Sequence, residues 1–216
     1  MSTEIPWFIG KCATLRCPRS GLRAWDHAGN TASCRPRHRK IAYAGGPMPH
    51  LTNLRRKEAF IHATRSIGLN VDASQIFEGA HTFEGGTMAA QRFLELKDRP
   101  TAIVCSNDIM AVGVMRVLAQ RNIKVPAEMS VVGFDDIHLA EFANPPLTTV
   151  RMSREDLARS AFNALQQLID SPTVTSHPPI YVGTTLIVRE STDFHTAATR
   201  GLRIKRISSK PISATA

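Results

Sequence analysis

Long apolar runs are missing from this 216-residue sequence: no stretch approaches the roughly 20 consecutive apolar residues that a membrane-spanning helix needs. The first residues, MSTEIPWFIGKCATLR, also lack the basic segment and the long apolar segment of a secretory signal peptide. We therefore expect no membrane partner and residence in the cytoplasm.

Motifs of common enzyme and cofactor sites are missing as well. The glycine pairs at 45–46 and 85–86 lie in neither G-x-x-x-x-G-K-[ST] nor G-x-G-x-x-G, the spacings that bind phosphate groups. No serine or cysteine lies in a nucleophile motif, and no two histidines have the His-x-x-x-His spacing of a helical metal site. The sequence predicts a protein that is not an enzyme and that holds no cofactor.

Cysteine is scarce, with four residues in the chain. Cys12-x4-Cys17 and Cys34-x3-His38 have separations that a tetrahedral zinc site can use. The alternative is chance spacing in a segment rich in arginine and cysteine, and we favour it, so no metal is expected. Cys105 ends an apolar strand and is expected to be a small buried hydrophobic residue. No disulfide framework is predicted.

Acidic residues are almost missing from the two ends of the chain. Residues 1–40 hold eight Lys and Arg against two acids, and residues 195–216 hold five against none. The net charge of +9 therefore comes from the ends, because residues 41–194 have a balance of −2. A folded domain that binds DNA has a basic surface, and this pattern does not predict one.

What the sequence does contain is a clear strand–helix–strand unit. The apolar run Thr101–Cys105 predicts a strand, and Asn107 with Asp108 is suited to capping a helix. A second apolar strand, Met129–Phe134, ends at a pair of aspartates. Such a unit forms a right-handed crossover in a parallel sheet, so the fold class is α/β. The core face of the helix is predicted from helical spacing: Met110, Val114, Val117 and Leu118.

Similar units precede and follow this one. The run IAYAGG predicts a strand at 41–46, and Thr52 or Asn53 is expected to cap a helix that ends at Gly68. A strand at Gln75–Ala80 and a helix from Phe83 to Leu96 come next. The later elements are an extended segment, a helix and a last strand: Leu147–Met152, Arg154–Ile169 and Tyr181–Val188.

Three motifs in one order, SND-x-MA-x-G, GFDD and PPLTTV, resemble the effector-binding half of the lactose-repressor (LacI/GalR) family of transcription regulators. The likeness runs from about Arg39 to Thr192. It implies a parallel-sheet, periplasmic-binding-protein-like domain whose second subdomain is largely complete and whose first is mostly missing. Residues 147–170 would belong to that missing subdomain.

The resemblance fails at both ends of the chain. We expect residues 1–38 to be an atypical basic leader outside the family and residues 193–216 to be a basic disordered tail, on either side of a sensor domain at 39–192. The expected reading is a regulator truncated at its N-terminus, without its helix-turn-helix headpiece. The helix after residue 153 would then have no sheet to cover, and its apolar side chains are expected to make the protein sticky: Leu157, Ala161, Leu165 and Leu168.

Four polar residues are expected at one edge of the sheet, because each lies in a different connection after a strand: Arg56, His81, Asn107 and Asp135. A carboxylate, a guanidinium and an amide suit polyhydroxylated ligands and nucleobases. The resemblance implies the same role, since R-K-E-A-F at 56–60 is similar to the family's R-x-x-G-F, with Ala59 in place of glycine. His81 falls where many members have a ring that stacks on the ligand.

Each of these residues has an alternative structural role. Asn107 can cap its helix and Asp135 the turn after its strand. Arg56 can belong to a solvated helix face, and His81 can be an ordinary loop histidine. The shared edge and the motif spacing favour a binding cleft.

The function that this sequence predicts is the effector-sensing domain of a LacI/GalR-type repressor. The effector would be a sugar, a nucleoside or a related metabolite, and the resemblance implies a homodimer. Operator DNA would be bound only through a headpiece that is absent here. The alternative is a sugar-binding receptor of a transporter with the same fold, which would need export from the cell.

Overall fold

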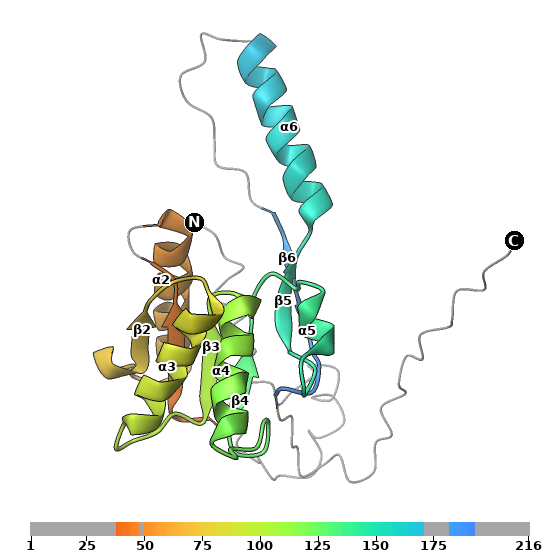
Figure 1. Cartoon of the computed structure of the whole chain (residues 1–216). Coiled ribbons are helices and arrows are strands. Elements are labelled where there is room, and N and C mark those ends of the chain that lie inside the picture. Colours follow the sequence, from red (N-terminus) through yellow and green to blue (C-terminus); the bar gives the residue numbers. More distant parts are fainter. Residues whose placement is uncertain (1–37, 48–49, 171–181, 193–216) are drawn as a thin grey trace, which may run out of the picture.

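The computed structural model describes residues 38–47, 50–170 and 182–192 (Figure 1). The expected leader, except for His38, and the expected tail lie outside these residues, as do Cys12, Cys17 and Cys34. Within the described ranges, no helix combines the length and the apolar character that crossing a membrane requires.

The centre of the fold is a four-stranded sheet in which every neighbouring pair is parallel, in the order β2-β1-β3-β4. The strands are β1 (Ile41–Gly45), β2 (Ile76–Glu78), β3 (Ala102–Cys105) and β4 (Ser130–Val132). Every residue of β1, β3 and β4 is buried, as is typical of strands that are covered on both faces. The α/β class with a parallel sheet, predicted from the sequence, is therefore confirmed.

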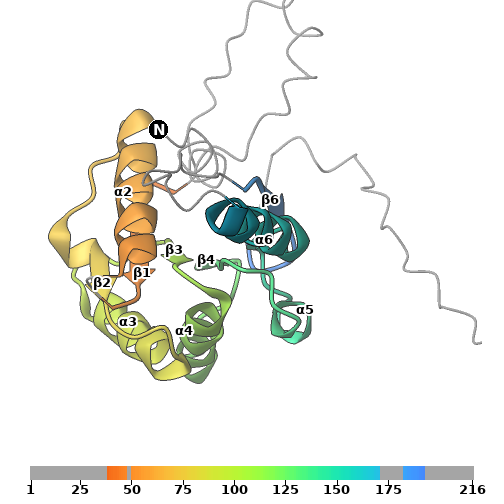
Figure 2. The ribbon, with the colours of Figure 1, turned by 90° about the horizontal axis from the view of Figure 1, so that it is seen from above.

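Helices cover both faces of this sheet (Figure 2). Helix α2 (Leu51–Ser66) packs on one face, where Phe60 stacks on Tyr43 of β1 with ring centroids 5.2 Å apart. Helices α3 (Phe83–Glu95) and α4 (Asp108–Gln120) pack side by side on the other face. The larger apolar cluster lies under these two helices, and all four predicted core residues of α4 are buried: Met110, Val114, Val117 and Leu118.

The prediction that Thr52 or Asn53 caps α2 is wrong. The helix begins at Leu51 after His50, which makes no side-chain capping bond, and Asn53 lies inside the helix with only 1% of its surface exposed. Its amide instead accepts a hydrogen bond from the Gly46 N–H at 2.9 Å and donates one to the Gly46 carbonyl. A buried amide that satisfies both backbone groups of the loop after β1 contributes more there than a cap exposed to water. Asn53 therefore fixes the loop that leads into α2.

Past the sheet, the chain forms a two-stranded antiparallel ribbon of β5 (Thr149–Met152) and β6 (Thr184–Ile187). The short helix α5 (Leu139–Phe142) precedes it, and a 3-10 turn (Ala73–Gln75) precedes β2. One parallel bridge, between Val132 and Thr148, joins the ribbon to β4. From the ribbon, α6 (Arg154–Asp170) projects away from the rest of the fold (Figure 1).

Every residue of α6 is described, and none of them is buried. The predicted apolar stripe is exposed, and two further large side chains, Phe162 at 65% and Ile169 at 70%, are exposed with it. Leaving large apolar side chains in water forgoes about 1.5–3 kcal/mol each.

We expect the purified protein to self-associate through α6. The triple variant Leu157→Glu, Phe162→Gln, Leu165→Lys should then elute as a sharper, smaller species in size-exclusion chromatography with light scattering. A monodisperse wild-type protein with one cooperative melt would contradict this.

Candidate functional site

The four predicted site residues lie at the same edge of the sheet, where the chain leaves the carboxyl ends of the strands. Arg56 comes from α2, His81 from the loop after β2, Asn107 from the end of β3 and Asp135 from the end of β4. Nη2 of Arg56 lies 3.4 Å from Oδ1 of Asp135, and Nη1 of Arg56 donates a hydrogen bond to the carbonyl of Ser106. The structure therefore brings together residues that are up to 79 positions apart.

Arg56 is held from three sides. Besides the contacts with Asp135 and Ser106, its guanidinium carbon lies 3.8 Å from the centroid of the Phe134 ring, a cation–π geometry. Its side chain is only 21% exposed. The alternative of a solvated helix face therefore does not apply to Arg56. A guanidinium has five N–H donors, so Arg56 keeps donors beyond those that contact Ser106 and Asp135.

Asp135 has an unusual backbone. Its φ is 109° and that of Asp136 is 50°, so two consecutive non-glycine residues have positive φ. Such conformations cost of order 1–3 kcal/mol each and concentrate at functional sites. Burial raises the pKa of the Asp135 carboxyl, and Arg56 opposes this rise by favouring the charged form. Asp135 is therefore a poorly solvated acceptor beside a fixed cation.

His81 lies against the backbone of Gly46, because the Cβ of any larger residue at Gly46 would collide with the imidazole ring. Its Nε2 is buried and has no hydrogen-bond partner among the residues that the structure describes. Burial lowers the pKa of His81, the charge of Arg56 lowers it further, and Asp135 raises it. An imidazole with a pKa below its usual value is neutral at neutral pH. Gly46 and Asn53, which place this ring, were not predicted as site residues.

The titration of His81 gives a direct test of this geometry. Arg56→Gln removes a positive charge, so the pKa of His81 is expected to rise towards its usual value. Asp135→Asn removes a negative charge, so the pKa of His81 is expected to fall further. Proton NMR titration of the ring signals measures both shifts. Equal pKa values in the two variants would contradict the proximity of the three side chains.

Asn107 has the structural role that was the alternative for it. Its Oδ1 accepts a hydrogen bond from the N–H of Met110 at 2.9 Å and so caps α4. The side-chain amide Nδ2 takes part in no hydrogen bond with the described residues. Asn107 is 8% exposed, and this amide group is its remaining donor at this edge of the sheet.

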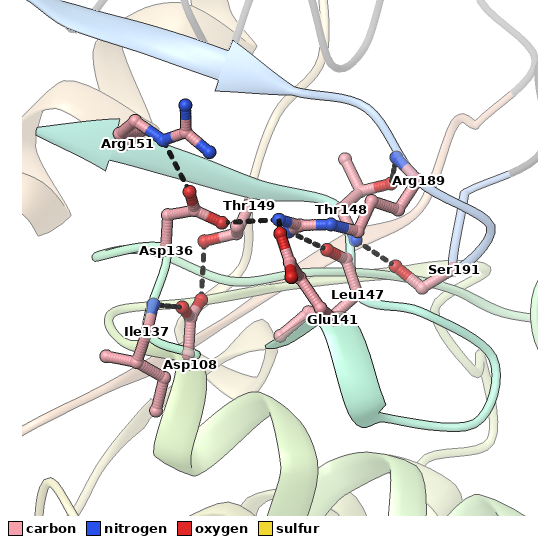
Figure 3. A network of polar contacts seen from close by, with 10 residues as sticks. All are labelled: Asp108, Asp136, Ile137, Glu141, Leu147, Thr148, Thr149, Arg151, Arg189 and Ser191. Atoms are coloured by element: carbon pink, nitrogen blue, oxygen red, sulfur yellow. Dashed lines mark hydrogen bonds and ion pairs between the residues drawn. The ribbon is translucent and has the colours of Figure 1, made fainter. Parts of the chain in front are cut away.

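A second set of polar residues, which were not predicted as site residues, forms a network between the strand ends and the ribbon (Figure 3). Asp108 is fully buried and accepts hydrogen bonds from the hydroxyl of Thr149 and from the N–H of Ile137. Asp136 forms ion pairs with Arg151 and Arg189. The signal in the sequence was their position, since each of these acids directly follows a predicted site residue, in SND and in FDD.

Burial raises the pKa of Asp108 to about 6, and the hydrogen bonds from Thr149 and Ile137 oppose this rise. The folded state therefore holds a proton on Asp108 at pH values where the unfolded chain, with a carboxyl pKa near 3.8, has lost it. The stability from this group is complete below the unfolded value and is lost as pH rises through about 6. For Asp136, burial opposes ionisation, but the bonds from Arg151 and Arg189 outweigh it and hold the pKa below its usual value.

The side chains gathered at this edge of the sheet are hydrogen-bonding groups of four kinds. A polar ligand could form hydrogen bonds with all four groups: the guanidinium and the amide can donate, the carboxylate can accept, and the neutral imidazole can do both. Among the described residues, no group of three or more His, Cys, Asp or Glu side chains is arranged to hold a metal ion.

Comparison with known proteins identifies relatives of the whole described region. A family model for the periplasmic binding protein-like domain matches residues 34–192. The chain is 35% identical over 155 residues to the HTH-type transcriptional repressor CytR of Escherichia coli (strain K12), which covers 72% of this chain and 45% of that relative. It is 33% identical over 150 residues to the HTH-type transcriptional repressor PurR of Mannheimia succiniciproducens. That match covers 67% of this chain and 45% of that relative.

Solved structures agree with these relatives. A complex of the transcriptional regulator CelR with cellobiose matches this structure with a TM-score of 0.69 at 26% identity, over 87% of this chain and 52% of that one. The chain spans about half the length of the curated relatives that it matches.

Proposed function

Because this chain belongs to the LacI/GalR family of regulators, through their periplasmic binding protein-like domain, we propose that residues 39–192 sense a small-molecule effector for a cytoplasmic transcription repressor. The observation that carries the proposal is the convergence of Arg56, His81 and Asp135 at the strand ends, with Asn107 beside them. Ligands bind open α/β sheets at this edge. In this proposal, the chain catalyses no reaction.

The charges of the site favour an uncharged polyhydroxylated ligand. The positive charge of Arg56 is offset by Asp135, and His81 is neutral, so the cleft has no excess of positive charge for a phosphate. Asp135 can accept hydrogen bonds from paired hydroxyls, and Arg56 can donate its remaining N–H groups. Solved relatives include a regulator bound to cellobiose and one with bound sucrose, and another is complexed with phosphate. Sugars and nucleosides are therefore the proposed class.

A thermal-shift screen with cellobiose, sucrose, adenosine, cytidine and inorganic phosphate tests this proposal. A ligand at 100 times its dissociation constant adds about 2.7 kcal/mol to the free energy of unfolding, which raises the melting temperature by several degrees. We expect such a rise with at least one neutral compound and none with phosphate. A rise with phosphate alone, or an equal rise in the variant Arg56→Gln with Asp135→Asn, would contradict the proposed site.

We further propose that operator DNA is contacted by a helix-turn-helix segment outside residues 39–192, because acids outnumber bases between residues 41 and 194. The alternative function, a sugar receptor of a transporter, requires export. Cell fractionation separates the two: a repressor stays with the cytoplasmic fraction, whereas a receptor appears in the periplasm.

The homodimer of the proposed repressor has a candidate surface on the outer side of α3, α4 and α5, where α4 lies between the other two helices (Figure 2). Large apolar side chains flank a hollow between α3 and α4, with Phe83 43% and Met88 58% exposed. On α5, Phe142 is 68% exposed. Exposed apolar patches of this kind mark association sites.

The α6 triple variant, in which association through α6 is removed, is expected to remain a dimer in analytical ultracentrifugation. Adding Met88→Arg with Phe142→Arg to this variant is expected to convert the dimers to monomers.

A further inference from the structure

Two strand-end pairs of residues, Asn107 with Asp108 and Asp135 with Asp136, have a shared arrangement. In each pair the first residue lies at the proposed cleft. The second residue contacts β5, and Asp136 also contacts Arg189 just after β6 (Figure 3). Neighbouring residues of the same short segment therefore connect the cleft with the ribbon.

The first connection runs through Asp108. Its carboxylate receives the hydroxyl hydrogen bond of Thr149 in β5 and, at 2.9 Å, the N–H of Ile137. Gly133 leaves the space for this carboxylate, because a Cβ at that position would collide with Oδ1 of Asp108 and lie 2.9 Å from Cδ2 of Leu147. Asp108 and Thr149 are both fully buried, so water cannot replace their bond.

The second connection runs through Asp136. Its Oδ2 lies 2.5 Å from Nε of Arg151 in β5, and its Oδ1 lies 2.8 Å from Nη2 of Arg189, just after β6. Arg189 also donates to the carbonyl of Leu147 at 2.9 Å. The side chains of Asp136 and Arg189 are only 5% and 12% exposed. Each arginine binds a different oxygen of this buried carboxylate, and charge-assisted bonds of this kind are stronger than surface ion pairs.

Three consecutive residues of β5 receive these contacts. Thr149 bonds to Asp108, the carbonyl of Val150 accepts the N–H of Asp135 at 2.9 Å, and Arg151 pairs with Asp136. The chain continues from β5 through Ser153 into α6, which has no buried residue of its own. The direction of α6 therefore depends on how these three residues are held.

We infer that Asp108 and Asp136 are positioning residues that couple the cleft to the ribbon, so that a displacement of Asn107 or Asp135 also displaces β5 and α6. This inference rests on the proposed ligand contacts of Asn107 and Asp135. The coupling follows from the backbone at Asp135 and Asp136, where positive φ at both positions forms a tight reversal. Such conformations persist only where the surrounding structure holds them, so Asp135 and Asp136 depend on the same set of contacts.

The experiment uses the whole chain without ligand. A residue that contacts the ribbon is changed and the pKa of His81 is measured; then a site residue is changed and hydrogen exchange in the ribbon is measured. Asp136→Asn weakens the pairs with Arg151 and Arg189 and is expected to release Asp135 from beside His81. The pKa of His81 should then fall, in the direction expected for Asp135→Asn. The charged and titratable groups that act on His81 are Arg56, Asp135 and His50.

In the reverse direction, Asp135→Ala removes a carboxylate that touches Arg56 but makes no side-chain contact with β5. Hydrogen exchange of the β5 and β6 amides is expected to become about 10-fold faster, which corresponds to about 1.4 kcal/mol of local opening. Reciprocal effects of this kind define coupling between two sites. Asp98→Asn is the matched control, since Asp98 pairs with Lys40 on the surface, and it should change neither readout.

A purely structural role for Asp136 predicts faster exchange in the ribbon with an unchanged pKa of His81, and that result would overturn the inference. Thr149→Val and Arg151→Gln are milder variants in case Asp136→Asn does not fold, and the same two readouts apply to them. Because no ligand is added, these results do not depend on the thermal-shift screen. Failure of the screen with an intact coupling would count against the proposed function alone.

Discussion

Gly86→Ala is expected to destabilise the protein by about 2 kcal/mol or more, because added atoms in a packed core force backbone shifts. A Cβ at Gly86 of α3 would lie 2.7 Å from the carbonyl carbon and 2.8 Å from Cα of Met110 in α4, and it would collide with the carbonyl oxygen. These are backbone atoms, which cannot rotate away. Alanine is otherwise favoured over glycine in a helix by about 1 kcal/mol. The collision with Met110 therefore makes the change in the free energy of unfolding unfavourable instead of favourable.

Two control variants separate this collision from other effects of replacing glycine. At Gly183 a Cβ would meet nothing within 4 Å, so Gly183→Ala should change stability by less than about 0.5 kcal/mol. At Gly68 there is also space, but φ is +77°, and Gly68→Ala should cost about 1–2 kcal/mol. Urea unfolding followed by circular dichroism gives all three values. If Gly86→Ala melted at the same urea concentration as Gly183→Ala, the close packing of α3 on α4 would be refuted.

The part of the fold that could be predicted from the sequence is the part with local signals. In the unit from β3 to β4, each boundary has its own cause: an apolar run, the cap at Asn107 and the aspartates after the last strand. Such signals depend on neighbours within a few residues. The same local pattern predicted the apolar stripe of α6, which the structure leaves exposed.

The residues that were missed depend on distant partners. Asn53 was expected to be a cap because its neighbours suggested a helix start, and its actual partner, the backbone of Gly46, is visible only in three dimensions. The partners of Asp108 and Asp136, Thr149 and Arg189, lie 41 and 53 positions further along the chain. From the sequence alone, the second residue of each pair would be expected to face solvent, because its partner is far along the chain.

The site lies between these two cases. The shared edge of Arg56, His81, Asn107 and Asp135 could be predicted because parallel strands place their following loops together. The packing contacts of each residue could not be predicted. Arg56 lies over Phe134, and the imidazole of His81 lies against Gly46. Those contacts depend on packing between elements, which periodicity does not report.

For whichever neutral ligand raises the melting temperature, Asp135→Asn is expected to weaken binding by roughly 10- to 100-fold. A hydrogen bond to a charged group contributes about 1.5–3 kcal/mol, and each 1.4 kcal/mol is a factor of ten. The amide keeps the shape of the carboxylate but replaces one acceptor with a donor, so a ligand with paired hydroxyls loses one bond. Isothermal titration calorimetry measures the ratio, with Asp98→Asn as the control that should bind like the wild type.

Arg56→Lys should weaken the same ligand by a similar factor although it keeps the charge. Lysine has no planar fork, so it cannot stack on Phe134 and reach Ser106 and Asp135 at once. A ligand that binds Arg56→Lys as tightly as the wild type would use Arg56 only as a positive charge. A ligand that binds Asp135→Asn unchanged would lie elsewhere on the molecule, because Asp135 and the guanidinium that it pairs with occupy the centre of the proposed cleft.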